Sequence, residues 1–315
     1  MRKYRTLALG ATVLALIVSA CSSGESSSAS ASQSQAASES MMEHPAVSIG
    51  SAGFYEAAVV GEIYAQALEA AGYEVDRHLE IGERPAVQAA LTSDEVNLVP
   101  EYLGGLASYL EAEVSADPQE TWDNMQAALQ EMGFTALDFS PGTDADGWVV
   151  RQETADEFDL STMSDVAEVA DQLVWGLAPA CAENPVCGPG LDEVYGIDIS
   201  QLEVENLSPC STEMAQALNN SAIDVAQVCT TQPDIVTFNF VLLEDDQHLQ
   251  PAQNMAPVLS QELADAGGDD LAAILNGITE KLTTEVLTEL GVAVVVDQQS
   301  LADVAAQFLE DNGLV

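Results

Sequence analysis

The stretch "AVSIGSAGFYEAAVVGEIYAQALEAAGYEVDRHLEIG", residues 46–82, has the clearest pattern of secondary structure in the sequence. Its first seven residues form a short apolar segment that runs into a glycine turn, which is typical of a strand. From Ala57 to Ala71 apolar side chains recur at helical spacing, and Gly72 follows as a helix stop. Residues 73–82 alternate and predict a second strand. The stretch therefore reads as a strand-helix-strand unit.

The segments after this unit repeat the alternation. "RPAVQAALTSDEVNLVPEY" predicts a helix, a turn and a strand, so the body begins with the β-α-β-α-β order of a parallel sheet. A second α/β series follows, and two helical segments, Asp269–Leu290 and Ser300–Asn312, close the chain. We therefore expect an α/β fold with two lobes joined by crossing strands. The predicted lobes are lobe I at residues 46–140 and 249–315, and lobe II at residues 141–248.

The charge balance restricts the possible partners. The chain has 315 residues with 52 acidic and 7 basic side chains, a formal net charge of −45. A surface this negative repels nucleic acid and anionic lipid head groups, so no nucleic-acid partner is expected. The acids are scattered through periodic segments, which favours a solvated surface adapted to salty surroundings over a specific acidic binding role.

The N-terminal residues 1–20 have the features of a secretory signal peptide. Three basic residues precede an apolar run from Leu7 to Val18, which is too short for a comfortable membrane span. The ending Val18-Ser19-Ala20-Cys21 resembles the bacterial lipobox, which implies cleavage before Cys21 and lipidation of its thiol. The alternative is an ordinary signal peptide with a chance cysteine. We expect an extracytoplasmic protein with a lipid anchor in the membrane.

Residues 21–45 are expected to comprise the lipidated cysteine and a flexible tether, which is rich in serine, alanine and glutamine. Cleavage before Cys21 removes three basic residues and no acid, so the mature charge is 4 − 52 = −48. The remaining cations are Arg77, Arg84, Arg151 and Lys281. An anionic ligand group therefore has few cationic side chains to bind.

The body contains four cysteines: Cys181, Cys187, Cys210 and Cys229. An even number outside the cytoplasm favours disulfides. Cys181 and Cys187 lie in the Pro- and Gly-rich loop "PACAENPVCGPG", where a short bridge is feasible, and Cys210 and Cys229 form the remaining pair. The rival is a metal site, but the three histidines are distant in sequence and show no ligand spacing, so no metal is expected.

Several motifs follow, in order, the pattern of one known family. They are "IGSAGFYEAAVVGEIYAQALEAAGYEV", "ALTSDEVNLVPEYLGG", "AIDVAQVCTTQPDI", "FVLLEDDQHLQPAQNMAPVL" and "EKLTTEVLTEL". The body, about residues 46–315, resembles the osmoprotectant substrate-binding proteins of ABC importers, which bind glycine betaine, carnitine or choline. The loop "PACAENPVCGPGLDEVYGID" resembles a cysteine-containing subgroup.

This resemblance implies a type II periplasmic-binding-protein fold, in which two lobes with mixed, mostly parallel sheets close on a small solute. It also implies a monomer that delivers the solute to an ABC permease in the membrane, without catalytic residues, cofactor or enzymatic activity. The rival classes are an enzyme and a structural or adhesion lipoprotein. No nucleophile elbow, P-loop or zinc motif is present, and βα alternation does not fit an antiparallel sandwich.

The candidate ligand-binding residues lie at strand ends, where open α/β sheets place their ligands. A quaternary ammonium group is held by aromatic faces, at ~0.5–2 kcal/mol per ring. Tyr102 matches the family's aromatic in "PEYTG", and Trp148 is a candidate wall from lobe II; core packing is the alternative for both. The further candidates are Phe54, Tyr55 and Glu56, which match "GSKNFTE", and Thr230, Thr231 and Gln232, which match "TTD". Core packing is the alternative for Phe54, and stabilising the N-terminus of the following helix is the alternative for Glu56.

Charged groups near these motifs leave the ligand open. Asp144 and Asp146 either supply negative potential or belong to a solvated loop, and we favour the loop. A ligand carboxylate requires Arg84, Arg151 or backbone amides.

The chain also departs from the family pattern. Ala52 replaces the motif lysine, Met214 and Ala215 stand where an aromatic is expected, and the tyrosine of "NNTYAL" falls near Asp146 or Gly147. The full tyrosine cage is therefore not reproduced. We still expect the solute-binding component of an ABC importer with a quaternary amine as solute, namely glycine betaine, choline or carnitine. The alternatives are another polar solute, such as an amino acid derivative, and a surface lipoprotein outside transport.

Overall fold

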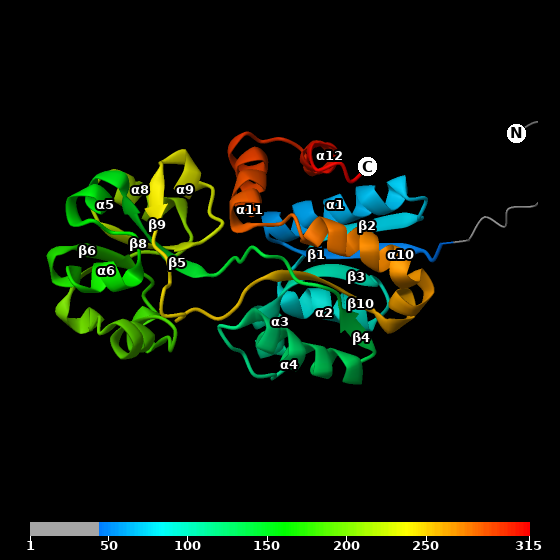
Figure 1. Cartoon of the computed structure of the whole chain (residues 1–315), viewed down its shortest axis with the longest axis horizontal. Helices are drawn as coiled ribbons and strands as arrows, with labels where there is room; N and C mark the ends of the chain where they lie inside the picture. Colours follow the sequence, from blue (N-terminus) through cyan, green and yellow to red (C-terminus); the bar gives the residue numbers. More distant parts are fainter. Residues whose placement is uncertain (1–43) are drawn as a thin grey trace, which may run out of the picture. The chain divides into compact units, whose positions relative to one another are not determined.

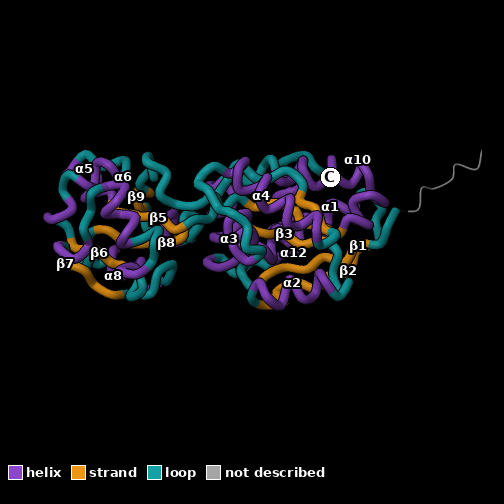
Figure 2. The backbone as a smooth tube through the Cα atoms, turned by 90° about the horizontal axis from the view of Figure 1, so that it is seen from below, coloured by secondary structure: helices purple, strands orange, loops and turns teal. Residues whose placement is uncertain are grey.

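The computed structural model describes residues 44–315. The predicted signal peptide, the predicted lipidation site Cys21 and nearly all of the predicted tether lie outside the described residues. Two five-stranded sheets form the body, and the strands of each come from the segments assigned above to each lobe (Figures 1 and 2). The two-lobed α/β expectation is confirmed, whereas the exact lobe boundaries stay a prediction.

The first sheet has the order β2-β1-β3-β10-β4. Its strands are β1 (Val47–Ala52), β2 (Val75–Gly82), β3 (Leu98–Tyr102), β4 (Phe134–Ala136) and β10 (Met255–Ser260). β1 pairs in parallel with β2 and β3, and β10 pairs antiparallel with β3 and β4. The late strand β10 thus completes a sheet that the first part of the chain began.

Helices cover both faces of this sheet, because side chains alternate along each strand. One apolar cluster packs beneath α1 (Tyr55–Ala70), α10 (Gln261–Thr279), α11 (Thr284–Gly291) and α12 (Leu301–Asp311). The other packs beneath α2 (Arg84–Thr92), α3 (Leu103–Tyr109) and α4 (Pro118–Glu131). On β3, Leu98 and Tyr102 belong to the first cluster and Val99 to the second. The alternation therefore turns Tyr102 toward the α1 face.

The second sheet has the order β7-β6-β8-β5-β9. Its strands are β5 (Asp146–Arg151), β6 (Val174–Leu177), β7 (Glu203–Asn206), β8 (Val225–Cys229) and β9 (Phe240–Leu242). The helices around it are α5 (Gln152–Phe158), α6 (Met163–Ala167), α7 (Gly188–Gly190), α8 (Thr212–Asn219) and α9 (Asp234–Thr237). β6 is parallel to its neighbours and β5 is antiparallel to β8 and β9. Both sheets therefore mix parallel and antiparallel pairs.

The chain crosses between the sheets twice, at residues 137–145 and 243–254. A β-bridge between Thr143 and Asn254 joins the two crossing segments. Thr230 Oγ1 donates to the carbonyl of Thr143 at 3.0 Å and accepts from Ala145 N at 3.1 Å. The end of β8 is therefore tied to the first crossing segment.

The predicted single helix at Asp269–Leu290 is wrong. α10 ends at Thr279, and α11 begins at Thr284 after Thr283, whose side chain accepts from the Val286 amide. Leu282 between them is fully buried, so the apolar periodicity continues through the break. The N-cap at Thr283 starts a new helix, as threonine does at this position.

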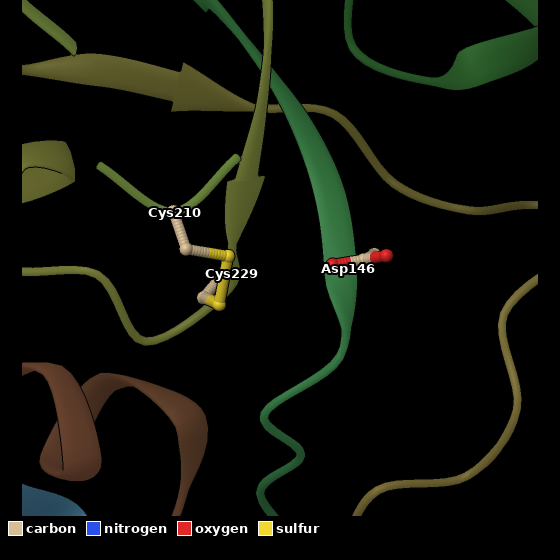
Figure 3. A group of neighbouring side chains, drawn as sticks. All are labelled: Asp146, Cys210 and Cys229. Atoms are coloured by element: carbon tan, nitrogen blue, oxygen red, sulfur yellow. A yellow bond between two sulfur atoms is a disulfide. The ribbon is translucent and has the colours of Figure 1, made fainter. Parts of the chain in front are cut away.

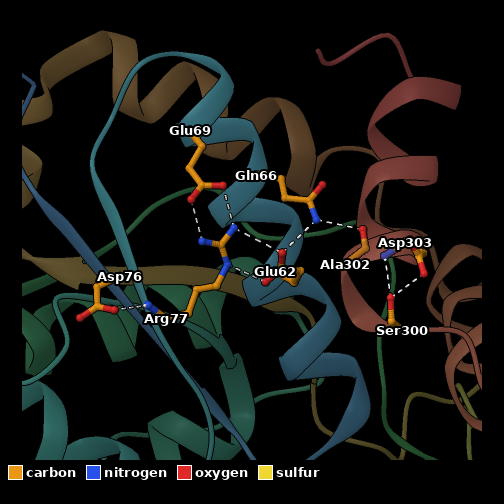
Figure 4. Close-up of polar contacts among 8 residues, drawn as sticks. All are labelled: Glu62, Gln66, Glu69, Asp76, Arg77, Ser300, Ala302 and Asp303. Atoms are coloured by element: carbon orange, nitrogen blue, oxygen red, sulfur yellow. Dashed lines mark hydrogen bonds and ion pairs between the residues drawn. The ribbon is translucent and has the colours of Figure 1, made fainter.

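All four Arg and Lys side chains of residues 44–315 form ion pairs, so most of the acids there have no cationic partner. Arg77 on β2 forms ion pairs with Glu62 at 2.8 Å and Glu69 at 2.7 Å on α1, while Gln66 donates to the Ala302 carbonyl of α12 (Figure 4).

Both predicted disulfides form: Cys181–Cys187 and Cys210–Cys229. Within the described residues, none of the helices combines the length and apolar character that a membrane crossing requires.

Candidate functional site

A cavity of about 630 Å³ lies beside the crossing segments and has walls from both sheets' loops. It brings together the predicted residues Phe54, Tyr55, Glu56, Arg84, Tyr102 and Gln232. The other lining residues are Gly53, Gly105, Asp144, Cys210, Thr212, Cys229, Pro233, Asp234, Gln253 and Val295. Strand ends thus converge here, as expected for an open α/β sheet.

Tyr102 ends β3 and immediately precedes α3. The chain turns sharply there because the amides of Leu103 and Gly104 donate to the carbonyls of Asn254 and Ala252 on the second crossing segment. A Cβ at Gly104 would lie 2.6 Å from the Ala252 oxygen. The first glycine of the pair is therefore needed for close backbone approach.

The Tyr102 side chain is 7% exposed and lies edge-on to the ring of Phe54, with centroids 6.5 Å apart and planes at 81°. Within residues 44–315 its hydroxyl has no hydrogen-bond partner. Burial raises the pKa of the Tyr102 phenol well above its usual value, so the ring is neutral. Phe54 is 48% exposed, and together they give the cavity an aromatic side.

Side chains at the start of α1 form hydrogen bonds with Thr231, which follows β8. The Tyr55 hydroxyl donates to the Thr231 carbonyl at 3.0 Å. The Thr231 hydroxyl oxygen lies 3.0 Å from Glu56 Oε1 and 2.6 Å from Asp144 Oδ1. Thr231 is fully buried behind the two acids, which line the cavity.

Burial and the neighbouring Asp144 charge raise the pKa of Glu56 to about 7. Burial also raises the pKa of Asp144. The solvated-loop interpretation of Asp144 is thereby wrong: its carboxylate is bonded to a buried hydroxyl in the cavity wall.

Arg84 is the first residue of α2 and the one arginine among the cavity-lining residues. Its Nε donates to Glu101 Oε2 at 3.1 Å, and Gln88 also donates to this buried carboxylate. In the described part of the chain, Nη1 and Nη2 donate no hydrogen bond, and a Cβ at Gly105 would lie 2.6 Å from Nη2. Two guanidinium nitrogens therefore stay available for an anionic group.

Arg151, the other candidate for a ligand carboxylate, is occupied elsewhere. It bonds Asp224 at 2.6 Å and the carbonyls of Leu218 and Ile223 in the second lobe. Gln232 does line the cavity, and its Oε1 is buried without a partner among residues 44–315 while its Nε2 donates to Asp234 at 2.8 Å. The cavity thus offers a free acceptor as well as free donors.

The structure does not bring Trp148 to this cavity. Its side chain is 1% exposed within the apolar core of the second lobe. Trp148, Asp146 and Thr230 instead line a separate cavity of about 430 Å³. Core packing, the alternative left open for Trp148, describes its position.

The Cys210–Cys229 disulfide forms part of the wall. Asp146 pairs with Cys229 across β5 and β8, and its carboxylate lies within 4.8 Å of both sulfurs (Figure 3). The two sulfurs are bonded to each other and thus cannot act as thiolate ligands.

Sequence reasoning missed the wall contributions of Gln253, Thr212 and this disulfide. Gln253 Oε1 accepts from the Gly105 amide at 3.0 Å. Its position depends on the second crossing segment meeting α3, a long-range contact without a local sequence signal.

A family model of known proteins matches most of the chain. The family model described as the substrate binding domain of an ABC-type glycine betaine transport system matches residues 45–311. The chain is 25% identical over 281 residues to the glycine betaine-binding protein YehZ of Escherichia coli K12, covering 85% of this chain and 90% of that protein. It is 24% identical over 271 residues to the carnitine transport binding protein OpuCC of Listeria monocytogenes, covering 84% and 86%.

Solved structures show the same fold. A structure described as a glycine betaine/carnitine/choline ABC transporter superposes with a TM-score of 0.78 at 22% identity, covering 85% of this chain and 99% of that one. Ligand-free YehZ from Escherichia coli superposes with a TM-score of 0.77 at 23% identity, covering 86% and 99%. The type II binding-protein expectation is confirmed at the level of fold.

Proposed function

We propose that the chain captures a small quaternary ammonium solute for an ABC permease, because it belongs to the family of substrate-binding domains of ABC-type glycine betaine transport systems. Glycine betaine, choline and carnitine are the solutes of this class that we propose. The names of the two relatives, a glycine betaine-binding protein and a carnitine transport binding protein, support the class.

One observation carries the proposal: the buried Tyr102 ring lines the same cavity as two carboxyl groups, Glu56 and Asp144. A quaternary ammonium donates no N–H hydrogen bond, so it is bound by an aromatic face and by nearby negative charge. Phe54 extends the aromatic side. The aromatic faces favour a soft, diffuse cation, whereas the carboxyl groups would also accept hydrogen bonds from a primary amine.

The opposite charge of a zwitterionic solute also finds a partner. The free Nη1 and Nη2 of Arg84 suit a carboxylate, which the guanidinium binds in bidentate geometry. The free Gln232 Oε1 suits the hydroxyl of choline or carnitine. We propose Tyr102, Phe54, Glu56, Arg84 and Gln232 as ligand contacts, with Tyr55 and Thr231 positioning the wall.

The proposal extends to location. We propose that Cys21 carries the lipid and that the mature protein acts as a monomer outside the cytoplasm, with no catalytic role. Fractionation of cells carrying Cys21→Ala tests the anchor: the variant should be found in the medium. Retention of the washed variant on membranes places the anchor elsewhere.

A thermal shift screen in high salt tests the solute. A binder gains RT ln(1 + [L]/Kd), about 2.7 kcal/mol at a hundredfold excess over Kd. Glycine betaine, choline or carnitine should raise the melting temperature, while an amino acid without a quaternary nitrogen should not. Stabilisation by the amino acid alone supports the rival solute class, and stabilisation by none favours a surface lipoprotein.

A further inference from the structure

Thr231 Oγ1 lies between two carboxyl groups that line the solute cavity. The Asp144 contact, at 2.6 Å, has the length of a hydroxyl donating to an ionised carboxylate. The Glu56 contact is 3.0 Å. The three groups come from α1, the first crossing segment and the loop after β8, so the cluster joins parts of the chain far apart in sequence.

One hydroxyl has one proton, so Thr231 donates to only one of the two acids. If its proton goes to Asp144, an ionised Glu56 would turn lone pairs toward the lone pairs of the hydroxyl oxygen. A protonated Glu56 instead donates to Thr231, which donates to Asp144, and both short contacts become hydrogen bonds. The raised pKa of Glu56 agrees with this arrangement.

The groups that face this pair do not supply a compensating cation. Tyr55 on α1 already donates to the Thr231 carbonyl, and Tyr102 on β3 presents a neutral phenol. Asp146 on β5 adds a further acid, and its pKa is itself raised by burial. None of the four cations in residues 44–315 forms an ion pair with Glu56 or Asp144, and Arg84 is bound to Glu101.

We propose that Glu56 and Asp144 share one proton through Thr231 in the solute-free protein, and that a positively charged solute displaces this proton. The inference rests on the proposed function. On binding, the Glu56 carboxyl loses its proton to water, its O–H bond breaks, and the carboxylate then faces the solute cation. The pair is thereby a specificity determinant: it stabilises a cation and penalises a neutral molecule of the same shape.

Calorimetry in buffers of different ionisation enthalpy measures this exchange directly. At about pH 6 the binding of choline to the mature protein should release close to one proton, and the association constant should rise about tenfold per pH unit. The neutral carbon analogue of choline, in which tert-butyl replaces trimethylammonium, should release no proton. Wild-type choline binding without proton release would overturn the inference and leave the proposed function intact.

Two variants locate the proton. Glu56→Gln keeps the side-chain shape and lets an amide N–H donate to Thr231, so choline should bind without proton release and without the pH dependence. Asp234→Asn is the matched control, because Asp234 lines the same cavity but bonds Gln232 rather than Thr231. It should release the proton as wild type does, and persistent release in Glu56→Gln would contradict the assignment.

A titration without solute keeps the inference testable if choline does not bind, which would refute only the proposed function. Carbon NMR of the side-chain carboxyls, with Glu56→Gln to assign the signal, should show Glu56 titrating near neutrality. Titration of Glu56 in the ordinary carboxyl range, around 4–5, would refute the shared proton whether or not a solute binds.

Discussion

Replacing Tyr102 tests the role of its ring in the cavity. The ring is 7% exposed, so a cation against it is largely desolvated and the contact belongs at the upper end of ~0.5–2 kcal/mol. Tyr102→Leu keeps an apolar side chain and removes the ring quadrupole. A loss of about 1.4–2 kcal/mol corresponds to roughly 10- to 30-fold weaker binding of a quaternary ammonium solute.

Tyr102→Phe separates the ring from the hydroxyl. Because the Tyr102 hydroxyl is buried without a partner in residues 44–315, its removal should leave the free energy of unfolding unchanged or raise it by about 1 kcal/mol. The affinity should fall less than in Tyr102→Leu, unless the hydroxyl contacts the solute. We prefer leucine to alanine because Tyr102 belongs to the first apolar cluster, where a large cavity costs about 3–5 kcal/mol of stability.

Isothermal titration of wild type and both variants gives the affinities, and denaturant unfolding shows that each variant is folded. Wild-type affinity in a folded Tyr102→Leu protein would show that the ring does not bind the solute. Tyr102 would then only pack against Phe54 and α1.

Three further predictions concern charge, pH and the disulfide. Arg84→Gln should weaken glycine betaine binding about tenfold more than choline binding, because only betaine has a carboxylate; equal losses in titration calorimetry would remove Arg84 from the ligand contacts. The folded-state pKa of Glu56, about 7, exceeds its unfolded value, so its contribution to the free energy of unfolding is fully present below about pH 4.5 and is lost as pH rises through 7. Unfolding curves of wild type against Glu56→Gln should differ in this window by roughly 1–3 kcal/mol, and parallel curves would contradict the raised pKa. Replacing Cys210 and Cys229 by alanine should lower the free energy of unfolding by about 2–4 kcal/mol and weaken solute binding, since the disulfide lines the cavity. Unchanged affinity with lowered stability would limit the disulfide to a structural role.

Local patterns predicted most of the fold because periodicity and turn residues act over short distances. The strand-helix-strand unit at residues 46–82 reads directly from apolar spacing and from Gly72, which adopts positive φ. The break at Thr283 was missed because buried Leu282 continues the helical apolar pattern across it. A capping residue within a periodic run gives only a weak local signal.

The site was predicted in part for the same reason. Tyr102 and Phe54 stand at strand ends, which the general rule for open sheets identifies. The cluster of Glu56, Asp144 and Thr231 depends on three distant segments and on the crossing of the chain between sheets. Trp148 also stands near a strand end, but periodicity does not tell which face of β5 points to the core.

The most direct test of the central claim is a crystal structure of the mature protein with bound glycine betaine. We expect the trimethylammonium group to lie against the Tyr102 ring and beside Glu56, with the carboxylate bound to Nη1 and Nη2 of Arg84. Betaine bound away from Tyr102 and Arg84, or a cavity that stays free of betaine at saturating concentration, would contradict it.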